Sequence, residues 1–332
     1  MGVVMATDVW SRDGTGNGRG RQADRPREVP ARGWLDVLKR TGRGIRETNA
    51  SIVAAGVAFY AFLALVPALI AVVAIYGLVA NPADVKDQIT SFTSALPRDA
   101  QKLLSGQLSS ITRKADSGTG VAAAIAIGAA LWSASSGIAA LNTGLTIVNH
   151  ENETRGMLKR RTLALVITLF AVVGVLVTLA LVVALPSVLD SIDITGVGGT
   201  VLKLARWPIL AGVLLVGLAV IFRYGPQRRR PRWRWVSPGA VVAMIVGLVA
   251  SIGFSIYVSR LGNYNKTYGA LGAIIIMLLW LYLMAFAVLF GAALNAELEH
   301  QTTRDTTAGG ERPMGERGAQ VADTVGPTRK EL

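Results

Sequence analysis

Few side chains inside the apolar stretches of this chain could do chemistry, and they suit anion binding better than catalysis. Lys203 and Arg206 are three residues apart, so they share one face of a helix. Asn265 and Lys266 lie just before the last apolar stretch, where the start of a helix also presents unpaired amides. Asn142 lies inside another apolar stretch, where an amide is costly unless it faces inward. These five residues form a candidate binding site for an anionic substrate.

Each of these residues also has an ordinary structural explanation. Lys203 and Arg206 can snorkel to lipid headgroups, and Asn142 can bond a neighbouring helix. The segment around Lys266 can be a turn at the membrane surface. A structure that gathered the residues around one cleft open to the membrane would favour the binding site over these alternatives.

The residues needed for most enzyme chemistry are missing. The chain has no cysteine and two histidines, and it lacks a phosphate-binding GxxxxGK[ST] loop, an HExxH motif and an acidic cluster suited to two metal ions. His150, Glu151 and Glu153 form a compact ionisable group, but they directly follow an apolar stretch, where a solvated boundary is the ordinary explanation. We therefore expect no enzyme, no metal ion and no cofactor.

Long apolar stretches dominate the chain. Its mean hydropathy is +0.45 and 52% of its 332 residues are apolar, gathered in blocks long enough to cross a bilayer. The sequence predicts an all-α, polytopic integral membrane helix bundle with six transmembrane helices. The predicted spans are about residues 51–80, 121–148, 163–189, 200–222, 236–258 and 268–296.

The basic residues indicate an orientation. The net charge is +13, and Lys and Arg concentrate in the N-terminal region, in the loop after the second span and in the RRRPRWR tract before the fifth. The positive-inside rule then places both termini in the cytoplasm, as an even number of spans requires. The same rule assigns this basicity to anionic lipid headgroups, so we expect lipid partners and no nucleic acid. The oligomeric state stays open.

Segments outside the spans are expected to be short helices or tails. Trp34, Leu35, Val37, Leu38 and Ile45 alternate with basic residues, as in an amphipathic helix on the membrane surface. Residues 81–118 form an external loop with two short amphipathic patterns. Residues 1–30 and 301–332 are expected to be disordered tails on either side of a membrane domain at 31–300.

Two features of the first two spans predict how they pack. Ser136, Ala140 and Gly144 recur at every fourth residue, and small side chains on one face let another helix approach closely. Pro67 lies near the middle of the first span, where it removes a backbone donor and favours a kink.

Several motifs together resemble the YihY/BrkB family of bacterial inner-membrane proteins, which includes proteins once labelled ribonuclease BN. The resemblance covers about residues 34–299 and rests on AAGVAFYAFLALVPAL, on LWSASSGIAALN, on the Ser237–Ala240 entry to the fifth span, and on YNKTYGALGAIIIMLLWLYL with LFGAALNAELE. It implies a six-helix, multi-pass protein of the bacterial inner membrane and a link to envelope lipid or lipopolysaccharide export. Many relatives carry Glu where this chain has Ala293, so the resemblance implies no proton-coupling role for this position.

Three functions follow as hypotheses. The leading one is a transporter or exporter of an amphiphilic anionic envelope substrate such as lipid. The alternative is a non-transporting envelope scaffold or partner-binding membrane protein. A ribonuclease BN-type nuclease is disfavoured because the His and Asp ligands of such an enzyme are missing.

Overall fold

Long helices make up the described part of the chain. The computed structural model describes residues 16–79, 120–184, 197–260 and 270–328, together with Glu331. Two 3₁₀ turns, Gly16–Arg19 and Pro26–Glu28, precede the helices, and a π-helical turn, Ala180–Ala184, extends α6. The helices are α1 (Ala31–Glu47), α2 (Ala50–Val79), α5 (Gly120–Val148), α6 (Met157–Leu179), α8 (Val197–Tyr224), α9 (Trp233–Arg260), α11 (Ala270–Glu299) and α12 (Gln320–Asp323).

Six of these helices, α2, α5, α6, α8, α9 and α11, are long and apolar enough to cross a membrane. Helices are favoured there because a bilayer offers no partners for backbone N–H and C=O groups. The predicted all-α class and the six predicted spans are thus confirmed. The predicted external loop at 81–118 lies outside the described residues.

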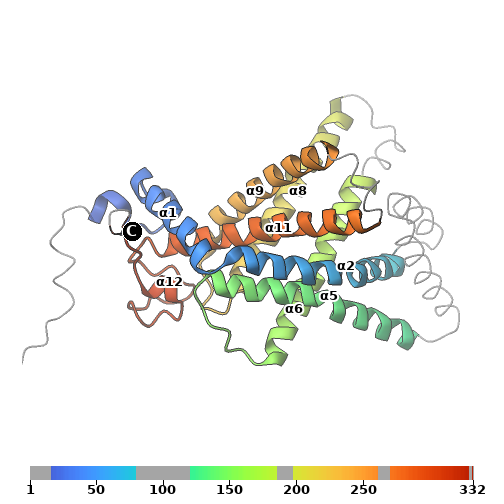
Figure 1. The fold of residues 1–332 in the computed structure, drawn as a ribbon, viewed down its shortest axis with the longest axis horizontal. Helices are drawn as coiled ribbons and strands as arrows, with labels where there is room; N and C mark the ends of the chain where they lie inside the picture. The colour runs from blue at the N-terminus through green and yellow to red at the C-terminus, as the bar shows by residue number, and fades with distance from the viewer. Residues whose placement is uncertain (1–15, 80–119, 185–196, 261–269, 329–330, 332) are drawn as a thin grey trace, which may run out of the picture.

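Four helices form the packed centre of the bundle. Helix α2 packs along α5, α9 packs along α11, and α11 joins the two pairs by packing on α2. Helix α6 packs on α5 and crosses it at a steep angle, while α8 packs on α9 (Figure 1). Because Phe170 of α6 and Val216 of α8 are 67% and 63% exposed, this outer pair presents much of its apolar surface to lipid.

Glycines on α5 allow the close contact with α2. A Cβ on Gly137 would lie 3.2 Å from the Ala61 Cα, and one on Gly144 would lie 3.0 Å from a Val53 methyl carbon. The small-residue row therefore reaches a neighbour at Gly144. Ala140 borders the same apolar core, whereas the Ser136 hydroxyl bonds the Ser133 carbonyl of its own helix. Pro67 lies inside α2, half-buried.

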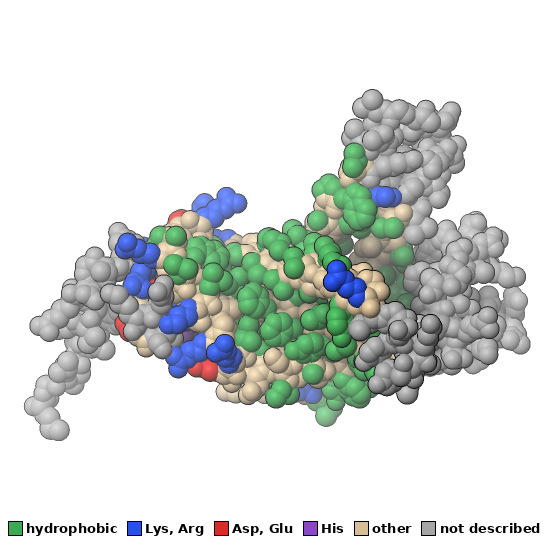
Figure 2. Space-filling view, turned by 45° about the horizontal axis from the view of Figure 1, so that its top comes forward, with side chains coloured by type: hydrophobic (Ala, Val, Ile, Leu, Met, Phe, Trp, Pro, Cys, Tyr) green, Lys and Arg blue, Asp and Glu red, His purple; other side chains and the backbone are tan. Residues whose placement is uncertain are grey.

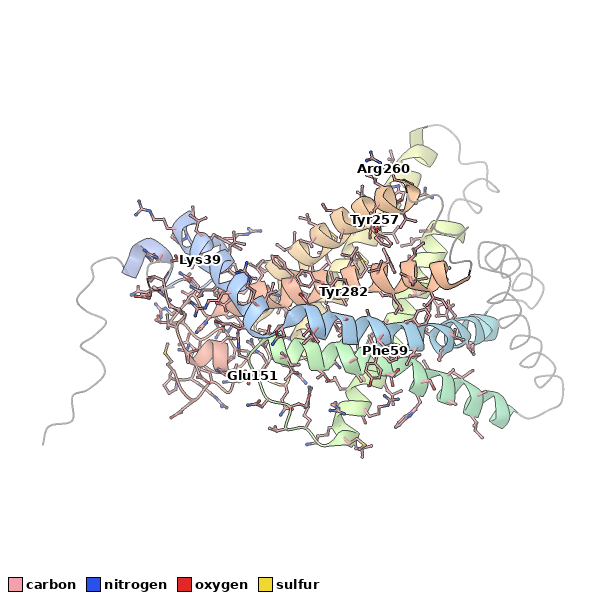
Figure 3. The ribbon with its side chains drawn as sticks, in the orientation of Figure 1. Lys39, Phe59, Glu151, Tyr257, Arg260 and Tyr282 are labelled. Atoms are coloured by element: carbon pink, nitrogen blue, oxygen red, sulfur yellow. The ribbon has the colours of Figure 1, made fainter. Side chains whose placement is uncertain are left out.

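One end of the bundle is polar. We call it the polar end; it comprises residues 19–47, 149–156, 225–234 and 297–328. Hydrophobic side chains cover the middle of the molecule, and Lys and Arg gather at this end (Figure 2). Lys39 and Glu151 lie there, whereas Tyr257 and Arg260 lie toward the opposite end of α9 (Figure 3). Both ends of the described chain meet here, since Arg21 donates to the Gly326 carbonyl. The location of the polar end in the cytoplasm stays a prediction.

The tails differ from the predicted disorder wherever they are described. Thr302 and Thr306 are fully buried, Val321 and Ala322 pack inward, and the Thr302 hydroxyl donates to the Ala23 carbonyl. Polar side chains here find backbone partners on other segments, a form of order that hydrophobic periodicity does not reveal. Residues 1–15 lie outside the described part.

Helix α1 is not a simple surface anchor. Val37 is fully buried with Trp235, Leu294 and Leu298, so α1 packs on the ends of α9 and α11. Leu35 and Leu38 are about half exposed, and they alone of the predicted apolar face are left for a membrane surface. The same periodicity describes a helix that packs against protein and one that lies on lipid, which is why the pattern misassigned Val37.

Candidate functional site

The structure does not bring together Asn142 and Arg206, the two members of the predicted anion site whose side chains it describes. Asn142 lies beside the end of α8, because a Cβ on Gly225 would be only 2.8 Å from the Asn142 Oδ1. Arg206 precedes Gly225 by 19 residues of α8, which separates the two by roughly 28 Å along that helix. The Lys203 side chain, Asn265 and Lys266 lie outside the described residues. Asn142 and Arg206 therefore cannot share one small ligand.

Asn142 has neither of the two environments predicted for it. It is fully buried, and neither Oδ1 nor Nδ2 has a hydrogen-bond partner among the described residues. Leu145 and Gly225 pack near it, so it lies in a close-packed region and not on a polar cavity. An unpaired buried amide is costly, and few native positions tolerate one.

Arg206 lies on an exposed part of α8. It lies near the start of the apolar part of α8, half-buried, with its guanidinium carbon 5.4 Å from the ring centroid of Trp207. Leu204 and Trp207 are both 61% exposed. A cation stacked on an aromatic ring among exposed apolar side chains is typical of the membrane interface.

Two of the motifs that carry the family resemblance interlock between α9 and α11. Gly239 follows a helix-interior proline, Pro238, and donates a 2.7 Å hydrogen bond to the Asn295 Oδ1. The Asn295 Nδ2 in turn donates to the Val236 carbonyl at 2.9 Å. Gly239 and Gly291 face each other so closely that a side chain on either would collide with the opposite backbone. One buried amide thus bonds the backbone on both sides of the proline.

The last turn of α11 carries two buried carboxylates, each paired with an arginine. Glu297 accepts a 2.6 Å bond from Arg40 of α1, and Arg40 also donates to the Gln301 side chain. Glu299 accepts from Arg228, and both of these side chains are 2% exposed. Buried pairs such as these fix geometry, and removing one partner leaves a charge without compensation.

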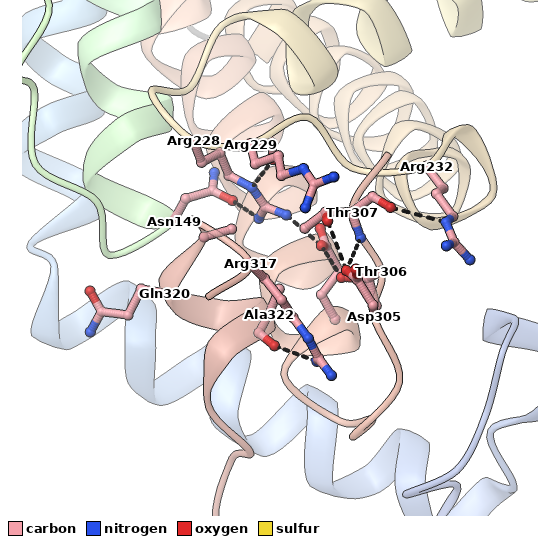
Figure 4. A network of polar contacts seen from close by, with 12 residues as sticks. Asn149, Arg228, Arg229, Arg232, Asp305, Thr306, Thr307, Arg317, Gln320 and Ala322 are labelled. Atoms are coloured by element: carbon pink, nitrogen blue, oxygen red, sulfur yellow. Dashed lines mark hydrogen bonds and ion pairs between the residues drawn. The ribbon is translucent and has the colours of Figure 1, made fainter. Parts of the chain in front are cut away.

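The C-terminal segment extends this polar network. Arg228 also donates to the Asn149 Oδ1, and the Thr306 hydroxyl donates to Glu299. Arg317 bonds the Ala322 carbonyl, and Asp305 accepts from the Thr307 hydroxyl and amide (Figure 4). The spans are thereby tied to the tail through side chains from four separate segments.

A cavity of about 400 Å³ opens at the polar end between α1, the end of α11 and the C-terminal segment. Both histidines line it: the His300 Nδ1 lies 3.5 Å from a Glu297 oxygen, and the His300 Nε2 lies 3.0 Å from the Thr324 hydroxyl. No group of three or more His, Asp or Glu residues in the described part of the chain is placed to hold a metal ion. Outside the spans, Arg155 holds the pKa of Glu153 below its ordinary value through a side-chain hydrogen bond.

Sequence reasoning did not single out Arg40 and Arg228. The available signal was the pair of acids, Glu297 and Glu299, at the end of the last span of a strongly basic chain. Buried acids need partners, but the choice among the 34 Lys and Arg residues depends on tertiary structure.

Comparison with known proteins gives a consistent result. The family model described as Virulence factor BrkB matches residues 41–315. The chain is 34% identical to the putative ribonuclease-like protein YfkH of Bacillus subtilis (strain 168) over 176 residues, which cover 51% of this chain and 63% of YfkH. It is 31% identical over 133 residues to a UPF0761 membrane protein of Pseudoalteromonas translucida (strain TAC 125), covering 40% and 42% of the two chains.

These matches leave part of each relative uncovered, since this chain spans less than two thirds of the length of either. No solved structure matches the chain. The family match covers most of the chain, and the six apolar helices agree with a multi-pass protein of the bacterial inner membrane. The chain therefore belongs to the virulence factor BrkB family.

Proposed function

We propose that this protein is a non-enzymatic transporter or exporter of an amphiphilic anionic envelope molecule such as a lipid. We further propose that the substrate moves along the lipid-facing surface and not through the centre of the bundle. Arg206 carries this proposal: it is a cation on a lipid-facing helix, flanked by exposed Leu204 and Trp207. The close packing around Asn142 agrees with a route outside the core.

A substrate with acyl chains suits such a route. Its tails can stay in the bilayer while a cation on the protein surface compensates the charge of its headgroup. The central helices then serve as a rigid support, and the outer pair, α6 and α8, supplies the path.

Lipid movement in reconstituted vesicles tests the proposal. Purified protein in liposomes should make a fluorescent anionic phospholipid accessible to an aqueous quencher several-fold faster than in empty liposomes, with or without an ion gradient. Arg206→Gln should slow the movement. Arg260→Gln, which removes the same charge at the end of α9, should not (Figure 3).

Equal rates in protein-containing and empty liposomes under every gradient would contradict transport. The second candidate, a non-transporting scaffold that binds partners, would then take its place. The polar end favours that alternative, because its buried ion pairs hold several segments in one fixed surface.

A further inference from the structure

Arg161, near the start of α6, is bound to the middle of α5. Its Nη2 donates a 2.6 Å hydrogen bond to the Trp132 carbonyl, and its guanidinium stacks on the Trp132 ring with Cζ 4.5 Å from the centroid. The Arg161 Nε is buried and has no hydrogen-bond partner among the described residues. Helix α5 therefore fixes the position of the guanidinium but leaves donors unused.

The position of Trp132 along α5 shows how deep this cation lies. Trp132 is 16 residues before Val148 and 12 residues after Gly120, roughly 24 Å and 18 Å along the axis. Helix α5 is about 43 Å long, and the hydrocarbon layer is about 30 Å thick. Because the excess of about 13 Å is smaller than either distance, the Trp132 carbonyl lies within the hydrocarbon layer of a bilayer that α5 crosses.

The surroundings of this cation face lipid. Trp132 is 51% exposed, and Met157 and Leu158 in the first turn of α6 are 82% and 77% exposed. Lys159 and Arg160 are exposed beside them. Helix α6 begins against α5 and crosses it steeply, so this basic turn lies on the outer surface of the bundle (Figure 1).

A charge at this depth needs a counter-charge. No carboxylate among the described residues forms an ion pair with Arg161, and its one hydrogen bond goes to a neutral carbonyl. Charged side chains inside membranes mark functional pathways unless they are paired. The missing anion must therefore come from outside the described part of the protein.

We infer that Arg161, with Lys159 and Arg160, binds the phosphate of an anionic phospholipid that lies against the outer surface of α5 and α6; as a step on the route of the substrate, this site rests on the proposed function. A guanidinium donates two parallel N–H bonds to phosphate oxygens, which a neutral headgroup amine cannot replace. The exposed Met157 and Leu158 would contact the acyl chains.

Lipid retention, measured without transport, tests the site. Native mass spectrometry of the full chain should show phosphatidylglycerol binding that is about 10-fold weaker in Arg161→Gln, the loss expected for a hydrogen bond between charged groups. Phosphatidylcholine binding should be unchanged in this variant. Arg260→Gln removes one positive charge elsewhere and should bind both lipids like the wild type.

The double variant Lys159→Gln/Arg160→Gln provides a second test in case Arg161→Gln does not fold. It changes exposed residues only and keeps the contact of Arg161 with α5. It should weaken phosphatidylglycerol binding several-fold. Unchanged binding in the double variant and in a folded Arg161→Gln protein would overturn the inference; if Arg161→Gln does not fold, the double variant alone decides. Lipid movement that persists in these variants leaves the proposed function standing without this site. If the variants lose phosphatidylglycerol binding but the wild-type protein moves no lipid, the binding site stands and the transport function does not.

Discussion

At the scale of single residues, two buried asparagines show how differently the same side chain can be used. Asn295 satisfies a backbone donor and a backbone acceptor on α9, and both of its amide atoms are bonded. Asn142 is equally buried, and neither of its amide atoms is bonded within the described structure. Asn295 is a structural bridge, whereas the unpaired amide of Asn142 lowers the stability of the fold.

Leucine, which has nearly the same shape as asparagine, separates these two roles. Asn295→Leu should lower the free energy of unfolding by about 1–3 kcal/mol, because the Val236 carbonyl and the Gly239 amide lose their partner. Asn142→Leu should be neutral or stabilising, since it removes two unpaired polar atoms. Thermal unfolding in detergent measures both, and a strong loss in Asn142→Leu would reveal a partner for this amide.

At the scale of elements, the contact between α9 and α11 depends on which glycines face each other. Gly239 and Gly291 bring the two backbones together where Asn295 bridges them. Gly247 belongs to the same interface about two turns farther along α9, but a Cβ there would lie 3.7 Å from the Met284 sulfur, an ordinary contact. The helices therefore approach most closely at Gly239 and Gly291 and pack at ordinary distances around Gly247.

Alanine at these glycines should have opposite effects. Gly291→Ala should cost about 1–3 kcal/mol of stability because the new methyl group meets the Gly239 carbonyl and the Ala243 methyl. Gly247→Ala fits the space and should stabilise by up to about 1 kcal/mol through higher helix propensity. Unfolding of the two proteins under identical conditions provides the comparison. Equal losses would mean that the interface is uniformly tight.

Elements could be predicted from the sequence better than the contacts between them. The six spans could be located from apolar length alone, because the bilayer sets the length of a crossing helix. The partners of Glu297 and Glu299 could not be predicted, since both lie far away in the sequence: Arg40 is 257 positions from Glu297, and Arg228 is 71 positions from Glu299. The anion site was predicted from residue type alone. The predicted spans already separate two of its members, because Asn142 lies near the end of the second span and Arg206 near the start of the fourth, on opposite sides of the membrane.

At the scale of the whole molecule, the polar end closes the bundle. The C-terminal segment runs from α11 to the loop at Glu151, where the Gln320 amide donates to the Glu151 side chain. It then returns to the end of α11, where the Gly326 amide donates to the His300 carbonyl. Within that segment, Asp305 accepts bonds from Thr307 and from the Arg312 amide. Burial alone would raise the pKa of Asp305, but these bonds outweigh it and hold the pKa below the ordinary value of 3.8.

The sign of this shift sets a pH dependence. A carboxylate with a lowered pKa in the folded state contributes stability above its unfolded pKa and loses it as the pH falls through the folded pKa. Docking of the tail through Asp305 should therefore be constant near neutral pH and weaken only below about pH 3.8. Near neutral pH, Asp305→Asn should speed tryptic cleavage after Arg317. Glu311→Gln, an exposed neighbour, should cleave like the wild type.

The bridge made by Asn295 has a consequence for how the protein is made. Chains are synthesised from the N-terminus, and the partner of the Gly239 amide lies 56 residues farther along. When α9 enters the membrane, the hydrogen bonds of Asn295 to the Gly239 amide and the Val236 carbonyl therefore cannot form until α11 has been translated. The fifth span is completed only by the sixth, which makes this hairpin the natural unit of membrane insertion and the point at which biogenesis of a truncated chain would fail.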